Sequence, residues 1–230
     1  MKTEVSKQRW KEAQDYEKNW WKKNSHFDSK MYVNNSKRIK DEIHNYINLK
    51  RKNKILQIGC GPDDVIHHFG EGKLYGIDPL MKDYNQMGIL KKDNVKNIKG
   101  VGENLPFEDN FFDLIIINNV LDHCQNPKKV LEEINRCLKK EGVLYTETNV
   151  RPKLLYPFLK MVWWTKISTA KGHPYLFLPK SLRKLIQSCN FEILEEHPNK
   201  QKFKLRYFLR LRDFVQHIIE YQYDFICKRR

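Results

Sequence analysis

Apolar residues along the chain change their spacing near residue 54, and this change separates two kinds of predicted element. Before it, residues 4–24 and 36–50 place apolar side chains three or four positions apart among Lys and Glu, which predicts two amphipathic helices. After it, short β-rich runs alternate with helical segments. The expected strands are 55–58, 74–77, 95–99, 112–117, 143–148 and 191–195, and the expected helices are 128–138 and 179–188. This alternation predicts an α/β fold with a largely parallel sheet.

The end of the chain returns to helical spacing, because apolar residues between Phe208 and Ile226 recur every three or four positions. The expected organisation therefore has five parts. They are an N-terminal helical cap at 1–53, a core at 54–150, a lid or acceptor-binding insertion at 151–178, the end of the core sheet at 179–200 and a basic amphipathic helix at 201–230.

Positive charge is concentrated in the two flanks of the chain. The 230 residues carry 43 Lys+Arg and 28 Asp+Glu, a formal charge of +15. Residues 1–54 hold 15 basic and 7 acidic groups, residues 151–230 hold 17 and 6, and the segment between them holds 11 and 15. Any contact with RNA or with an anionic membrane surface would therefore involve the flanks. A solvated lysine-rich surface explains the same excess equally well.

Neither the first residues of the chain nor its cysteines point to export or to a structural metal. The first five residues, Met-Lys-Thr-Glu-Val, lack the apolar stretch of a secretory signal. The cysteines are odd in number and show no C-x-x-C spacing; they are Cys60, Cys124, Cys137, Cys189 and Cys227. These features predict a cytoplasmic protein without a metal site.

The first predicted strand ends in a glycine turn, Gly59-Cys60-Gly61. Such a turn exposes backbone N–H groups where no Cβ obstructs a ligand. Asp78 ends the next strand, where an acidic side chain can accept hydrogen bonds from both hydroxyls of a ribose. Together the turn and the carboxylate favour a cofactor that contains adenosine.

Five segments in order resemble the class I S-adenosylmethionine-dependent methyltransferases, in their small-molecule branch. The segments are 55–63 (ILQIGCGPD), 76–78 (GID), 102–113 (GENLPFEDNFFD), 119–123 (NVLDH) and 131–142 (LEEINRCLKKEG). The resemblance implies a Rossmann-like, doubly wound, mostly parallel seven-stranded sheet with helices on both faces. It also implies S-adenosylmethionine as the cofactor and makes a dehydrogenase the weaker interpretation.

The same resemblance assigns cofactor contacts residue by residue. The glycine turn would line the methionine part, Asp78 would hold the ribose, and one of the two residues after it would pack on the adenine. Two further positions fall where the family contacts the adenine edge, and one past the fourth strand would reach the amino-acid end through its backbone. The implied residues are Gly59, Cys60, Gly61, Asp78, Pro79, Leu80, Gly102, Glu103 and Asn118.

Three departures from the family pattern concern the cofactor site. Gln57 stands where an aspartate is usual, Asp63 where a third glycine is usual, and Val101 where an acidic residue often faces the adenine amino group. Gln57 can accept a hydrogen bond from an ammonium group, but without the charge that strengthens it. These departures keep a non-catalytic relative that only binds the cofactor as an alternative.

Histidine suits the role of general base when the methyl acceptor is a hydroxyl. His173, in Gly-His-Pro-Tyr after the predicted lid, is the preferred candidate, and His123 is second because an Asp-His pair at its position commonly packs behind the pocket in this family. The acceptor is expected to be a small molecule, a sugar or a polar lipid-linked compound. An RNA methyltransferase that uses the basic flanks is the alternative.

Overall fold

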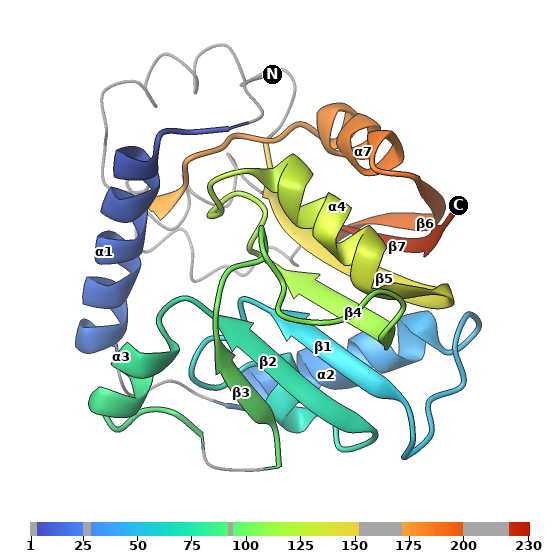
Figure 1. Cartoon of the computed structure of the whole chain (residues 1–230), viewed down its shortest axis with the longest axis horizontal. Coiled ribbons are helices and arrows are strands. Elements are labelled where there is room, and N and C mark those ends of the chain that lie inside the picture. Colours follow the sequence, from blue (N-terminus) through green and yellow to red (C-terminus); the bar gives the residue numbers. More distant parts are fainter. Residues whose placement is uncertain (1–3, 25–28, 92–93, 152–171, 200–220) are drawn as a thin grey trace, which may run out of the picture.

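A seven-stranded sheet forms the centre of the protein in a computed structural model that describes residues 4–24, 29–91, 94–151, 172–199 and 221–230 (Figure 1). The strand order is β3-β2-β1-β4-β5-β7-β6; β1 to β5 run parallel, and β7 is antiparallel to its neighbours β5 and β6. The strands are β1 (Lys54–Ile58), β2 (Lys73–Asp78), β3 (Lys96–Lys99), β4 (Phe112–Asn118), β5 (Leu138–Val150), β6 (Phe191–Asn199) and β7 (Tyr221–Arg229). The predicted Rossmann-like fold is confirmed.

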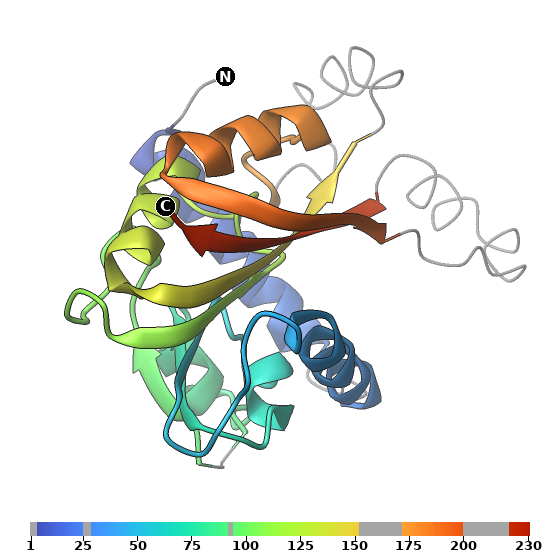
Figure 2. The same ribbon diagram turned by 90° about the vertical axis from the view of Figure 1, so that its right-hand side faces the viewer.

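Helices cover both faces of this sheet (Figure 2). One face packs against α4 and α7, and the other packs against α2 and the 3₁₀ turn η1. Side chains of β4 enter both cores, since Ile115 belongs to the first and Ile116 to the second, and both are fully buried. This burial explains the continuous apolar run of β4. The helical elements are α1 (Lys7–Lys23), α2 (Lys30–Ile43), η1 (Val65–His68), α3 (Met81–Gln86), α4 (Pro127–Cys137) and α7 (Pro179–Ser188).

The connection from β1 to β2 holds a single 3₁₀ turn in place of the helix that usually joins two parallel strands. The second predicted helix, at 36–50, instead begins at Lys30 and ends at Ile43, and it packs against η1. Ser36 of α2 donates to the backbone carbonyl of His68 at 3.0 Å. A helix from the N-terminal segment thus covers the face that the short crossover leaves open.

Arg38 of α2 ties this helix to the sheet through two buried carboxylates. Its guanidinium lies 2.5 Å from Glu147 on β5 and 3.7 Å from Asp224 on β7, and it donates to the hydroxyl of Tyr145 at 2.8 Å. Glu147 and Asp224 are only 1% and 2% exposed. Burial, with the charges of Glu42 and Glu147, raises the pKa of Asp224 to about 7. Arg38 is the group that contacts both carboxylates, and His197 also lies 3.8 Å from Asp224.

The C-terminal part of the predicted helix at 201–230 is wrong, because Tyr221–Arg229 form β7. Phe225 and Cys227 face the core under α4 and α7, and Ile226 faces the opposite core. This alternation of buried side chains between two faces is the period of a strand. Both faces are buried because β7 inserts between β5 and β6. Because apolar residues lie on both faces of β7, their spacing in the sequence also matches that of a helix.

Other predictions for the flanks concern residues that the structure does not describe. The lid at 151–178 is described only at Arg151 and from Gly172 onward, where Phe177 forms a parallel bridge with Val150 at the end of β5. Residues 152–171 of the lid and residues 200–220 of the C-terminal segment lie outside the described residues.

The N-terminal segment crosses the edge of the sheet to which β2 and β4 point (Figure 1). The backbone N–H of Val5 donates to the carbonyl of Gln125, before α4, at 3.0 Å. The other end of α1 reaches α3 through an ion pair between Lys18 and Asp83. Helix α1 and the residues just before it therefore lie along the carboxyl ends of the parallel strands. Across the described helices, none has the length and apolar content needed to cross a bilayer.

Candidate active site

The glycine turn after β1 occupies a backbone conformation that favours glycine. Gly59 has φ 66° and Gly61 has φ 54°, and a Cβ on Gly59 would lie 2.2 Å from Cγ2 of Val120. The expectation of free N–H groups is wrong: Gly59 and Cys60 donate to the carbonyl of Ile77, at 2.8 and 3.4 Å. Parallel neighbours β1 and β2 end at the same edge, so their backbones pair there. The turn is left with a surface that carries no Cβ at its two glycines.

Asp78 lies at this turn and not in bulk solvent. Its carboxylate accepts hydrogen bonds from the backbone N–H of Gly61, at 3.1 Å, and of Leu80, at 2.8 Å, and also from the side chain of Tyr84. Burial raises the pKa of Asp78 to about 6, and the three hydrogen bonds oppose that rise. A carboxylate has about four lone-pair positions, so it can still accept from a ribose hydroxyl.

Residues on α1 and α3 complete the surroundings of the turn. Trp21 is 8% exposed, and its Cζ2 lies 3.6 Å from the position of a Cβ on Gly61. Its ring meets that of Tyr84 edge to face, with centroids 5.8 Å apart. Leu80 is buried in the same apolar cluster, whereas Pro79 is half-buried. The sequence analysis missed Trp21 and Tyr84, although the tryptophan pair at one end of α1 was a visible signal.

The side chain of Gln57 is hydrogen-bonded to the loop that follows β1. Its Oε1 accepts from the N–H of Ile66 at 2.8 Å, and its Nε2 donates to Asp64 at 2.7 Å. Asp63 likewise accepts from Ser29 at 2.7 Å and faces His68 at 2.8 Å. Both departures from the family pattern therefore hold the shortened crossover in place, and contact of Gln57 with the cofactor stays a prediction.

The residues predicted at the adenine edge have contacts of their own. Gly102 is buried between Ile58 and Val130, whose atoms would lie 3.0–3.1 Å from a Cβ there. Glu103 accepts from the backbone N–H groups of Gln125 and Asn126, at 2.7 and 3.1 Å, and so orders the start of α4. Their cofactor contacts stay predictions.

Asn118 ends β4 close to the glycine turn, two residues before Val120. Its side-chain oxygen is buried, and no described residue donates a hydrogen bond to it. A buried acceptor without a donor is costly and suits a ligand that brings one. The predicted backbone contact of Asn118 with the amino-acid end of the cofactor stays a prediction, and this side-chain oxygen is a further candidate acceptor.

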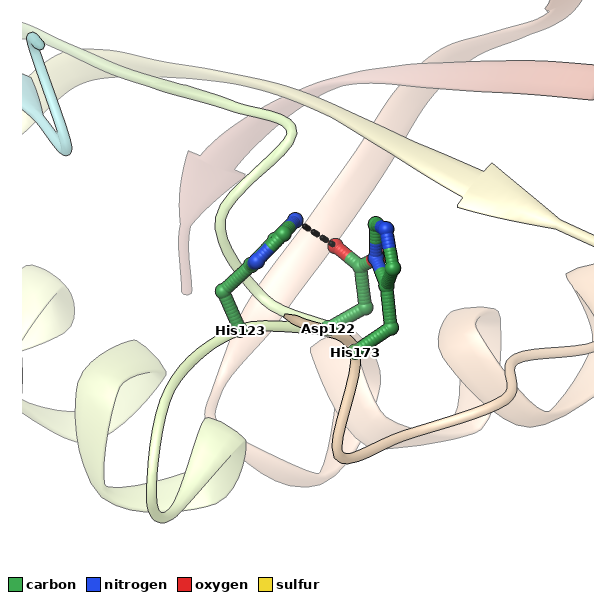
Figure 3. Close-up of side chains that lie close together, drawn as sticks. All are labelled: Asp122, His123 and His173. Atoms are coloured by element: carbon green, nitrogen blue, oxygen red, sulfur yellow. Dashed lines mark hydrogen bonds and ion pairs between the residues drawn. The ribbon is translucent and has the colours of Figure 1, made fainter. Parts of the chain in front are cut away.

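His123 and His173, the two predicted catalytic residues, lie together beside Asp122 (Figure 3). His173 Nδ1 is 2.8 Å from Asp122 Oδ2, and the two imidazole centroids are 4.2 Å apart. Asp122 follows β4 in the loop before α4, and His173 reaches it from the segment before α7. The sequence analysis noticed the Asp122-His123 pair but did not assign Asp122 to the site, since its partner is 51 residues away.

Neighbouring positive groups keep the carboxylate of Asp122 ionised. Burial would raise the pKa of Asp122, but His123, His173 and Arg151 outweigh it and lower that pKa to about 2. Burial lowers the pKa of His123, against the attraction of Asp122. An ionised carboxylate beside an imidazole N–H fixes the tautomer of His173 and places the proton-accepting atom at Nε2.

The order of strands, the glycine turn and Asp78 define a class I S-adenosylmethionine-dependent methyltransferase. The chain matches the model of the methyltransferase domain family over residues 31–196, and it belongs to that family. S-adenosylmethionine is the methyl donor of this class.

Similar proteins agree with this class. An uncharacterized methyltransferase of Schizosaccharomyces pombe, C1B3.06c, is 31% identical over 124 residues, which are 47% of this chain and 45% of that protein. A demethylmenaquinone methyltransferase of Staphylococcus saprophyticus is 28% identical over 187 residues, 73% of this chain and 72% of that protein. The chain thus spans less than half of the first relative and more than two thirds of the second.

One solved structure shows the same fold. Phosphoethanolamine N-methyltransferase 2 of Haemonchus contortus, in complex with phosphomonomethylethanolamine and S-adenosylhomocysteine, aligns with a TM-score of 0.63 at 16% identity. The alignment covers 85% of this chain and 52% of that one.

Proposed function

We propose that this protein transfers a methyl group from S-adenosylmethionine to a small molecule that carries a hydroxyl group, and that His173 takes the hydroxyl proton. One observation carries the proposal, the 2.8 Å contact between His173 Nδ1 and Asp122 Oδ2 in the loop after β4. Methyl transfer to a group without a proton needs no base. An oriented imidazole therefore favours an acceptor that must lose one.

Each residue of the site has a task in this reaction. When bound, S-adenosylmethionine supplies a methyl group already activated by a positively charged sulfur. Gly59 and Gly61 give the turn its left-handed backbone conformation, and Asp78 accepts hydrogen bonds from the ribose. His173 receives the acceptor proton at Nε2, while Asp122 holds the ring in place. Orientation of the acceptor in line with the methyl group supplies much of the rate.

Two classes of acceptor must lose a hydroxyl proton in this way. The first is a hydroxyl of a sugar or polar lipid-linked molecule, which becomes an oxygen nucleophile when it loses its proton. The second is a ring carbon of a hydroquinone, which becomes nucleophilic when the adjacent hydroxyl is deprotonated. After methylation this carbon loses its hydrogen as a proton, which restores the aromatic ring. The 28% identity to a demethylmenaquinone methyltransferase over 73% of the chain favours including the second class.

Incubation with methyl-labelled S-adenosylmethionine tests the proposal directly. The acceptors are a naphthohydroquinone lacking its ring methyl group, a set of hexoses and their phosphates, and total tRNA. We expect label in a hydroxyl-bearing small molecule, with the position read by NMR. Label in tRNA alone, with transfer falling steeply as salt rises, would overturn the small-molecule assignment in favour of the RNA alternative.

Replacing Asp78 by alanine is expected to weaken binding of S-adenosylmethionine by about 1–3 kcal/mol, because a buried charged acceptor is lost. Isothermal titration measures the change. Asp41→Ala removes an equal charge from an exposed position on α2 and serves as the control. Equal dissociation constants for Asp78→Ala and the control would mean that Asp78 does not hold the ribose. Absence of binding to the wild-type protein would contradict the cofactor itself.

A further inference from the structure

The cluster of Asp122, His123 and His173 contains a buried carboxylate oxygen that lacks a donor. Asp122 is 1% exposed, and among the described residues nothing donates a hydrogen bond to its Oδ1. Its other oxygen faces His173 Nδ1 at 2.8 Å. Oδ1 points toward His123 Nε2, 3.9 Å away, which is too long for a hydrogen bond (Figure 3). The charge of Arg151 helps to keep Asp122 ionised, but Oδ1 still lacks a hydrogen-bonding partner among the described residues.

His123 does not supply that partner as a neutral ring. A neutral imidazole has one N–H, and His123 gives a hydrogen bond to the backbone carbonyl of Gly172. The contact with Gly172 therefore uses the proton that Oδ1 would require. The remaining ring nitrogen carries a lone pair, which is the form of histidine that binds metal ions.

We propose that Asp122, His123 and His173 together bind one divalent transition-metal ion of the zinc type. Each residue offers one ligand atom, and all three atoms lie within 4.8 Å of one another. Two imidazole nitrogens and a carboxylate oxygen are a known zinc donor set that leaves a fourth position open. With bonds of roughly 2.0–2.2 Å, the ligand atoms must close by about 1 Å. Two of the ligands lie in the loop between β4 and α4, and the third lies just before Pro174, so side-chain rotation can provide this closure.

The surroundings of the three ligands also suit a metal ion. Metal-bound histidines usually donate their second N–H to a carboxylate or a backbone carbonyl, which orients the ring. His123 has such a contact with the backbone carbonyl of Gly172. The sequence analysis expected no metal because it considered cysteine spacing. The five cysteines, all buried and none in a disulfide, are not part of this cluster.

A bound ion has a consequence that rests on the proposed function. The ion would take Nδ1 of His173, the nitrogen that faces Asp122, so the single proton of the neutral ring would lie on Nε2. A protonated Nε2 cannot receive the acceptor proton, so zinc binding and the base role exclude each other. We expect methyl transfer to fall when zinc is added and to return when a chelator removes it.

Calorimetric titration of chelator-treated protein with zinc sulfate tests the site without reference to activity. We expect one ion per chain with micromolar or tighter affinity. The variants Asp122→Asn, His123→Gln and His173→Gln should each weaken binding by about tenfold or more. His44→Gln, which changes an exposed histidine just after α2, is the matched control and should bind zinc like the wild type.

Cobalt(II) absorption by the wild-type protein gives a second measurement that needs no variant to fold. We expect a spectrum typical of nitrogen and oxygen ligands, without thiolate charge transfer. No binding to the wild type, equal binding by all three cluster variants, or a thiolate signature would overturn the metal site. If zinc binds without inhibiting, the metal site stands and the role of His173 as base fails. If zinc does not bind and His173→Asn is inactive, the base stands and the metal site fails.

Discussion

Replacing His173 by asparagine is expected to lower kcat by about 10²–10⁴-fold, the usual contribution of a general base. The asparagine side chain keeps a polar group near Asp122 but cannot accept a proton at neutral pH. Affinity for S-adenosylmethionine should not change, because the glycine turn and Asp78 belong to a different part of the site. Initial rates measured with the acceptor identified above, in the presence of a chelator, separate this effect from metal binding.

The control for that variant is His44→Asn, which removes an exposed histidine and should leave kcat unchanged. Asp122→Asn adds a test of positioning. An amide cannot fix the tautomer of His173 as a carboxylate does, so kcat should fall while the KM for the acceptor stays the same. An unaltered kcat in His173→Asn would mean that the acceptor loses its proton by another route or carries none.

Replacing Arg38 by methionine is expected to destabilise the protein by about 3–5 kcal/mol, the cost of leaving buried charges without their partner. Glu147 and Asp224 would both remain in the interior, at the junction of α2 with β5 and β7. Methionine keeps most of the side-chain volume, so the loss reports charge more than packing. Denaturant unfolding followed by circular dichroism measures the free energy of unfolding.

The size of this effect should depend on pH in a defined direction. The pKa of Asp224 is raised to about 7, above its ordinary value, so the folded state binds its proton more tightly than the unfolded state. The stability that this proton contributes is lost as pH rises through 7. The Arg38→Met penalty should therefore be larger at pH 8, where Asp224 is ionised, than at pH 5.5, where it is protonated. Lys37→Met, at an exposed position of the same helix, should cost little at either pH, and an equal cost for the two variants would contradict this account.

Much of the cofactor half of the site could be predicted from local sequence. The glycine turn and Asp78 lie at the ends of neighbouring strands β1 and β2, and parallel strands that pair in register bring their carboxyl ends together. Knowing the two strands was therefore enough to place Gly61 beside Asp78. The same reasoning failed for the turn N–H groups, since it did not count the pairing of the turn with Ile77.

The acceptor half could not be predicted in the same way. His173 and Asp122 are 51 residues apart, and their contact depends on how the segment before α7 returns to the loop after β4. Trp21 reaches the glycine turn only because α1 crosses the edge of the sheet. From the sequence alone Gln57 is a candidate cofactor ligand. In the structure the short crossover brings Asp64 and Ile66 to its side chain.

The sequence by itself determined the parallel core, because hydrophobic period and turn chemistry are properties of neighbouring residues. The class of protein followed from the resemblance of five sequence motifs to a known family. Only the tertiary structure decided that Tyr221–Arg229 form a strand, that α2 replaces a crossover helix, and that Asp122 joins two histidines. These features depend on pairing and burial between distant segments, and local periodicity carries no information about them.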